Sequence, residues 1–128
     1  MPDLTAKRRP LWYNLSPLNL PVPGLVSILH RVSGALLFLG LIAFFYLLDL
    51  SLASESGYAR AGEILGAPIA KLLVIASVWA LVHHLCAGVR HLLLDLDVGT
   101  NLPAAKRSAV AVLIVSLALT ASIAVRLW

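Results

Sequence analysis

The chain is short of both charge and cysteine. Only 12% of its 128 residues are Asp, Glu, Lys or Arg, about half of the roughly 25% that is usual in soluble domains. A single cysteine, Cys86, excludes an internal disulfide and any metal cage built from several cysteines. The basic residues flank apolar segments instead of forming a stripe, so the net charge of +4 does not indicate a nucleic-acid partner.

Three long apolar spans account for most of the composition, in which 60% of residues are hydrophobic. They cover residues 32–48, 72–89 and 108–125, and each holds 17 or 18 residues before its flanks are counted. A helix needs about 20 apolar residues to cross a bilayer. A buried soluble bundle would need polar outer faces, which the third span lacks. The sequence therefore predicts an all-α integral membrane protein with three transmembrane helices, at about residues 24–50, 67–94 and 106–127.

The distribution of Lys and Arg predicts the orientation. Basic residues at positions 7–9 precede the first span, and Lys106 and Arg107 precede the third, while the loop between the first two spans has no basic excess. Because cytoplasmic loops are the basic ones, we expect the N-terminus in the cytoplasm and the C-terminus outside. In the outer loop, residues 57–66 can form a short surface helix.

The N-terminal residues are expected to form a separate segment. Four of the first 23 residues are prolines at or after position 10, which precludes a long helix there. We expect residues 1–23 to be a proline-rich cytoplasmic arm and residues 24–128 to be the three-helix membrane domain. The basic start meets prolines instead of an apolar core with a cleavage site, so no signal peptide is expected.

Ionisable residues gather near the end of the second span, over residues 84–95. Such groups are costly at membrane depth and usually have both a partner and a function. On a helix, His84, Gly88, His91 and Asp95 share one face. A glycine between two imidazoles lets a flat, bulky group approach the backbone, which is what a buried haem would need.

His84 and His83 allow different interpretations. A neutral imidazole at His84 suits haem iron, but it can also hydrogen-bond across helices. His83 points about 100° away around the helix, so both cannot bind one iron from the same side. For His83 an interhelical hydrogen bond is the favoured interpretation. A six-coordinate haem would need its second histidine from another chain.

We expect the start of the first helix to lie at the same depth in the membrane as the end of the second helix, on the cytoplasmic side. Arg31, with Ser27 one turn before it, can present a charge and a hydroxyl to a small carbonyl-bearing ligand, or Arg31 can extend to the membrane interface. His30, together with Arg90 and His91, can bind carboxylates such as haem propionates, or anionic lipid headgroups.

Two further groups of residues have structural interpretations. Asp95 can pair with an arginine or relay protons. The small residues Ser33, Gly34 and Gly40 indicate close packing of helices.

These two stretches resemble a known family. Ser27-Ile-Leu-His-Arg-Val-Ser-Gly34, followed by His84-x3-Gly-Val-Arg-His-Leu-x2-Asp95, is similar to the cytochrome b membrane-anchor subunits of succinate dehydrogenase (respiratory complex II). The similarity extends over nearly the whole chain. It implies a multi-pass subunit of a bacterial inner membrane that has no turnover of its own. It also implies a b-type haem shared with a second anchor subunit, and docking of an iron–sulfur subunit and a flavoprotein subunit.

The resemblance also implies roles for individual residues. His84 matches the axial ligand of the haem iron, and Ser27 and Arg31 match a site for ubiquinone reduction. His30 and Arg31 lie where contacts to the haem propionates are expected, and Asp95 matches a position linked to proton supply. His91 stays a candidate contact to the haem from the residues alone. The chain departs from the family pattern at His83, where an aromatic residue is common.

Two alternatives stay open at this point. An anchor subunit of a fumarate reductase would run the reverse reaction with the same general architecture. A haem-free scaffold or transporter subunit belongs to another class. A transporter would be expected to show ionisable residues at mid-membrane or interrupted helices, and neither is evident in the sequence.

Overall fold

The computed structural model describes residues 20–128, so the predicted arm, residues 1–23, lies almost wholly outside the described part. Within residues 20–128 the chain forms four helices and no strand. In chain order these are α1 (Val22–Ala53), α2 (Glu55–Gly66), α3 (Pro68–Asp95) and α4 (Leu102–Leu127). The helices α1, α3 and α4 are long and apolar enough to cross a membrane. The prediction of an all-α protein with three transmembrane helices is confirmed, while the orientation of the termini stays a prediction.

Prolines open the three long helices. Pro23, Pro68 and Pro103 each lie within the first two helical positions, where a missing N–H is not needed and the fixed φ is already helical. Asn101 caps α4, because its side-chain oxygen accepts a hydrogen bond from the Ala104 amide at 2.9 Å. This cap and Pro103 explain why α4 begins four residues before the predicted position 106.

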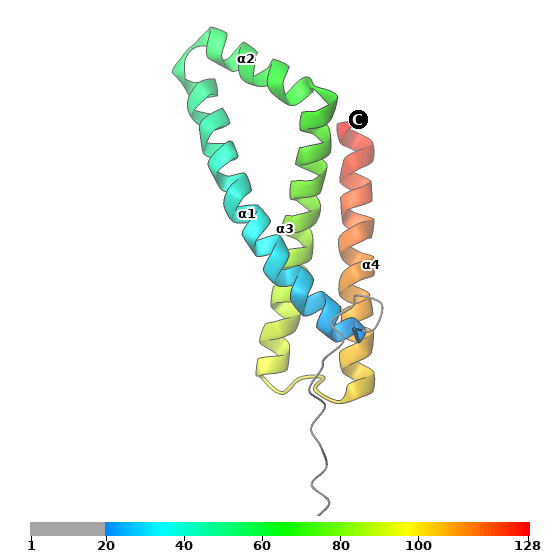
Figure 1. The fold of residues 1–128 in the computed structure, drawn as a ribbon. Coiled ribbons are helices and arrows are strands. Elements are labelled where there is room, and N and C mark those ends of the chain that lie inside the picture. Colours follow the sequence, from blue (N-terminus) through cyan, green and yellow to red (C-terminus); the bar gives the residue numbers. More distant parts are fainter. Residues whose placement is uncertain (1–19) are drawn as a thin grey trace, which may run out of the picture.

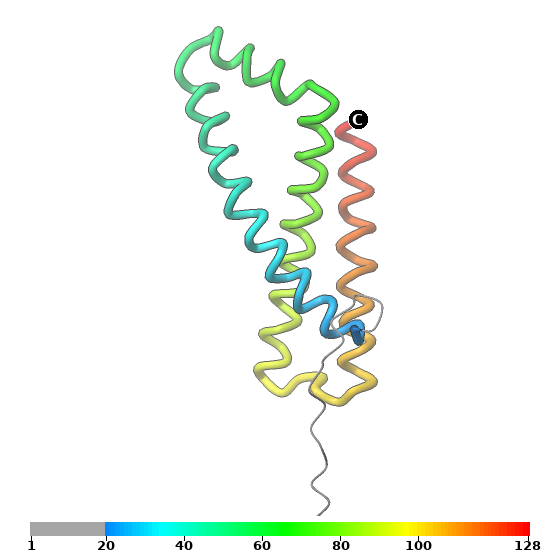
Figure 2. The backbone as a smooth tube through the Cα atoms, viewed as in Figure 1, coloured from blue at the N-terminus to red at the C-terminus, as the bar shows by residue number. Residues whose placement is uncertain are grey.

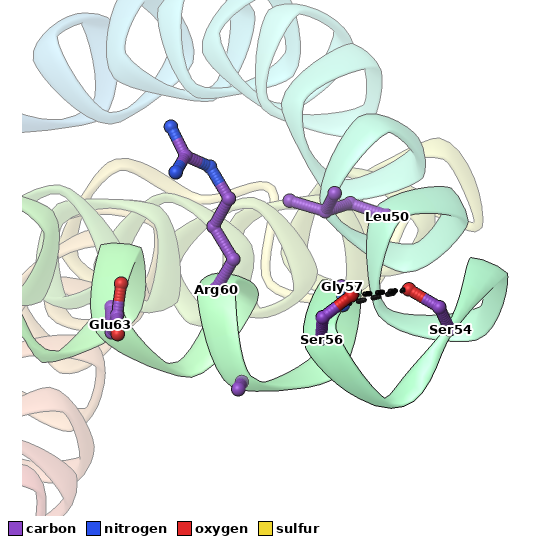
Figure 3. Close-up of a pocket in the computed structure, with 7 residues that line it drawn as sticks. Leu50, Ser54, Ser56, Gly57, Arg60 and Glu63 are labelled. Carbon is purple, nitrogen blue, oxygen red and sulfur yellow. Dashed lines mark hydrogen bonds between the residues drawn. The ribbon is translucent and has the colours of Figure 1, made fainter.

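A tight corner joins α1 to the short helix α2 (Figure 3). The Ser54 hydroxyl caps α2 by accepting a hydrogen bond from the Gly57 amide at 2.9 Å. A Cβ atom at Gly57 would collide with the Leu50 carbonyl oxygen, so only a glycine lets α2 fold back this closely. The short surface helix expected over residues 57–66 is confirmed, and it begins at Glu55.

The helix α1 crosses α3 obliquely and diverges from it toward α2, while α4 runs beside α3 (Figures 1 and 2). Small residues of α1 face α3 where these two helices approach each other. A Cβ at Gly34 would lie 3.0 Å from the His84 ring, and a Cβ at Gly40 would lie 4.0 Å from the Ser77 hydroxyl. The close packing predicted for Gly34 and Gly40 is confirmed. Glycines allow such an approach because no side chain separates the two backbones.

The three long helices meet at a small apolar core. Val26 of α1, Ala87 of α3, and Ala109 and Val112 of α4 pack together there. These side chains are small, so the helices lie close together. Larger side chains point outward, and Phe38 is 67% exposed. An apolar surface around a core of small residues is what a lipid environment requires, because lipid tails solvate the large side chains.

The C-terminal end of α4 lies beside the start of α3 (Figure 1). The Lys71 ammonium lies 5.7 Å from the centre of the Trp128 ring, within the range of a cation–π interaction. The start of α1, the end of α3 and the start of α4 lie together at the other end of the bundle (Figure 1). The histidines are near this end, and α2 is at the other.

Candidate functional site

Three histidines from two helices form one cluster where α1 crosses α3. The rings of His30 and His84 are stacked, with centroids 4.1 Å apart and planes inclined by 14°. The ring of His91 lies 5.1 Å from that of His30 at a tilt of 57°. The predicted convergence of the two stretches at one depth is therefore observed. His84 is half-buried within this cluster. It lies roughly 24 Å along the axis of α3 from the first residue of that helix, at 1.5 Å per residue.

The orientation of His84 is fixed by two oxygen atoms of α1. Its Nδ1 lies 3.0 Å from the carbonyl oxygen of His30 and 3.2 Å from the hydroxyl of Ser33. A carbonyl oxygen only accepts hydrogen bonds, so the Nδ1 atom of His84 carries the proton. In the neutral imidazole, Nε2 is then the nitrogen with a free lone pair. This is the tautomer that a metal ligand requires.

Two glycines, Gly34 and Gly88, lie against the rings of the cluster. The space at Gly88 does not face open surface, because a Cβ there would lie 3.4 Å from Nε2 of His30. Gly88 therefore accommodates the His30 ring, and not directly a flat ligand. Gly34 is the tighter position, with a Cβ only 3.0 Å from Cε1 of His84.

His83 points into the interface between α3 and α4. It is fully buried, stacks on Trp79 at a centroid distance of 5.2 Å, and lies with Nδ1 3.5 Å from the Ser116 hydroxyl. Its Nε2 atom is buried without a hydrogen-bond partner among the described residues. The geometry agrees with the interhelical interpretation, and the two adjacent histidines serve different interfaces.

Arg90 also faces α4, away from the histidine cluster. Its Nε donates a hydrogen bond to the Ser108 hydroxyl at 3.0 Å, and one of its terminal nitrogens donates to the Ala105 carbonyl at 3.2 Å. Only 6% of the residue is exposed. The arginine thus ties the ends of α3 and α4 together, and it is not placed beside His30 and His91 as a propionate contact.

The other predicted site residues lie around the cluster. Ser27 is half-buried and Arg31 is exposed, one turn apart on α1. Asp95 is exposed at the last position of α3, and no described residue pairs with it. The side chain of Arg31 is therefore accessible to a ligand, to lipid or to another subunit.

Comparison with known proteins identifies the family. Residues 5–123 match the succinate dehydrogenase/fumarate reductase transmembrane subunit family. The chain belongs to this family. It is 36% identical over 122 residues to the succinate dehydrogenase cytochrome b556 subunit of Coxiella burnetii, covering 94% of this chain and 98% of that one. It is 30% identical over 113 residues to the subunit of the same name from Paracoccus denitrificans, covering 88% and 87% of the two chains.

For a transmembrane subunit of this family, the cluster suits one axial ligand of a haem. His84 is half-buried and has its Nδ1 proton engaged, so Nε2 is the available donor. The ring of His30 is stacked on that of His84, so the two imidazoles do not face each other across a space for a ligand. The described residues therefore fit a haem that His84 would hold through Nε2.

Sequence reasoning missed the contribution of Ser33. It indicated only close packing at this position, but the structure places the hydroxyl against Nδ1 of His84. The available signal was its position, three residues after His30 and next to Gly34 in α1. Helical period alone could not show that this face of α1 meets His84.

Proposed function

We propose that this chain is the haem b-binding membrane-anchor subunit of succinate dehydrogenase, without turnover of its own. The observation that carries the proposal is the hydrogen bonding of the half-buried His84 ring. Its Nδ1 is held by the His30 carbonyl and the Ser33 hydroxyl, and its Nε2 is available in a half-buried layer. Family membership and the cytochrome b556 names of the relatives support the same function.

In this proposal Nε2 of His84 would bind the haem iron, and a second anchor subunit would supply another histidine. His30 packs against the His84 ring, and Arg31 and His91 supply donors for the propionate carboxylates, since charged donors bind carboxylates most strongly. When bound, a b-type haem supplies a one-electron carrier at this depth.

Ser27 and Arg31 are proposed to contribute to the site for ubiquinone reduction. They lie one turn apart on α1, and the charge of Arg31 is exposed. Reduction of a quinone places negative charge on its carbonyl oxygens, so preorganised donors stabilise the reaction. Arg31 and Ser27 supply such donors at one carbonyl, and other subunits must supply the rest. Asp95, exposed at the same end of the bundle, is the candidate for proton supply.

The soluble subunits are proposed to dock at the end of the bundle that holds the histidines. The positive-inside pattern assigns this end to the cytoplasm, and the family suggests a multi-pass position in a bacterial inner membrane. The iron–sulfur subunit would then deliver electrons close to the polar layer, and the flavoprotein subunit would oxidise succinate beyond it. Three of the four described helices are apolar spans, and in this proposal succinate chemistry belongs to those partners.

A fumarate reductase anchor is the second candidate, because the family description includes both enzymes. The names of the relatives favour succinate dehydrogenase. A haem-free scaffold is the candidate of another class. In that candidate the contacts of His84 with the His30 carbonyl and the Ser33 hydroxyl would serve only to hold α3 against α1.

The test is the reduced-minus-oxidised absorption spectrum of the purified complex. We expect a b-type band in the wild type, its loss or strong change in His84→Ala, and its retention in His83→Phe. Phenylalanine is the matched control because it refills the buried space beside Trp79. An unchanged bis-histidine spectrum in His84→Ala would exclude this residue as the ligand, and the absence of any haem band in the wild type would favour the scaffold.

A further inference from the structure

We propose that Ser33 is a positioning residue that shares the Nδ1 proton of His84 with the His30 carbonyl and thereby lowers the reduction potential of the haem bound there. This inference depends on the proposed function, since it assumes that Nε2 of His84 binds the iron. It concerns the hydrogen bonds to Nδ1 of His84, the ring nitrogen that would not bind the iron.

The geometry is a triangle of three polar atoms at the crossing of α1 and α3. The Ser33 hydroxyl donates to the His30 carbonyl at 2.9 Å. Because its one proton is used there, its oxygen accepts from Nδ1 of His84 at 3.2 Å. The same Nδ1 proton also points to the His30 carbonyl at 3.0 Å. Ser33 is fully buried, so water does not compete for these hydrogen bonds.

A simpler role for Ser33 is the ordinary hydrogen bond of a helical serine to a preceding carbonyl. Ser51 makes that bond alone, to the Leu48 carbonyl at 2.9 Å, from a more exposed position on the same helix. Ser33 differs because its oxygen is also directed at a histidine 51 positions away in the chain. The neighbouring Gly34 leaves room for this approach, since a Cβ would lie 3.0 Å from the ring.

The chemical consequence follows from the direction of the hydrogen bond. A proton on Nδ1 that is shared with two oxygens leaves more electron density on the ring, so Nε2 becomes a stronger donor to a metal. A stronger donor stabilises ferric over ferrous iron and lowers the potential. Loss of the Ser33 oxygen leaves the His30 carbonyl as acceptor, so the ligand is weakened but keeps its tautomer.

The test compares Ser33→Ala with Ser51→Ala in the assembled complex, by redox titration of the haem band. We expect the Ser33 variant to bind haem and to shift the reduction equilibrium toward the ferrous form by roughly three- to tenfold, where tenfold corresponds to about 59 mV for one electron. The low-spin ferric EPR spectrum should change as well, because it responds to the electron density on the axial imidazole. Ser51→Ala should match the wild type in both.

Two outcomes separate this inference from the proposed function. If His84→Ala keeps its spectrum, the proposed function fails and Ser33 has no ligand to tune. If His84→Ala loses the haem but Ser33→Ala has a wild-type potential and EPR spectrum, only the role of Ser33 is overturned.

Ser33→Cys keeps the test decisive if Ser33→Ala does not bind haem. Sulfur fills a similar volume but is a weak acceptor, so the potential should lie above that of the wild type. A wild-type potential in Ser33→Cys would overturn the inference.

Discussion

The imidazole rings of His30 and His84 lie parallel, with centroids 4.1 Å apart, although 54 positions separate them in the chain. This stacking joins α1 to α3 at the level of the proposed haem ligand. His30 therefore contacts His84 in two ways: its ring stacks on the imidazole, and its carbonyl oxygen accepts a hydrogen bond from Nδ1. Substitutions in α1 should therefore alter the spectrum or the content of the haem, although α1 does not supply the proposed ligand.

The first prediction concerns Arg31. Removing its side chain would take away the proposed charged hydrogen bond to the quinone, worth about 1.5–3 kcal/mol, which is roughly 10- to 150-fold in binding or rate. Arg31→Ala and Ser27→Ala should slow ubiquinone reduction in membranes and leave succinate oxidation by an artificial dye nearly intact. Lysine at position 31 should restore only part of the rate, because it keeps the charge but loses the planar fork.

The measurement for Arg31 is the ratio of quinone-linked to dye-linked turnover, with Arg60→Ala as the control. Arg60 is exposed on α2 (Figure 3), and α2 lies at the end of the bundle away from the start of α4 (Figure 1), so its removal should leave the ratio unchanged. Wild-type ubiquinone reduction in assembled Arg31→Ala and Ser27→Ala would show that these residues are structural.

The second prediction concerns Gly34. An added methyl group would lie 3.0 Å from Cε1 of His84, so the ring must move away from its acceptors. Gly34→Ala should broaden or shift the haem band and reduce haem content per complex. The matched control is Gly62→Ala in α2, where nothing lies within 4 Å and alanine improves helix propensity by about 1 kcal/mol. Equal spectra in the two variants would mean that the ring tolerates the methyl group.

The third prediction concerns Gly88. A Cβ there makes an ordinary contact with Nε2 of His30 at 3.4 Å, so Gly88→Ala should be tolerated. Gly88→Leu places a branched side chain where the His30 ring lies and should displace that ring, disturbing haem incorporation. Haem content of purified Gly88→Leu, measured beside Gly88→Ala, tests this expectation. Full occupancy in the leucine variant would show that Gly88 serves helix packing alone.

The fourth prediction concerns Arg90 and the stability of the bundle. Arg90→Ala removes two hydrogen bonds to α4 and leaves a cavity beside Ser108, and hydrogen bonds to charged groups contribute about 1.5–3 kcal/mol each. The complex should dissociate or lose haem at a lower temperature, with an unchanged haem potential. Ser108→Ala, which removes one of the two partners, should give a smaller shift. A thermal midpoint equal to the wild type in Arg90→Ala would contradict the anchoring role.

Much of the candidate site could be predicted from the sequence, because helical period relates residues on one helix. The spacing from His84 to His91 gave a shared face, and it assigned His83 to another face of α3. Contacts between helices could not be predicted in this way. Ser33 and Ser116 are both small polar residues in apolar spans, yet one contacts His84 and the other contacts His83.

The sequence by itself determined the number and type of membrane-crossing elements. Backbone groups in a bilayer must be satisfied internally, so apolar spans of 17 or 18 residues with their flanks form helices. Only the tertiary structure decided which faces of these helices meet. Association of helices in lipid depends on close packing of small side chains and on a few hydrogen bonds. The crossing of α1 over α3 places Gly34 against His84. The packing of α4 beside α3 brings Ser108 within hydrogen-bond distance of Arg90.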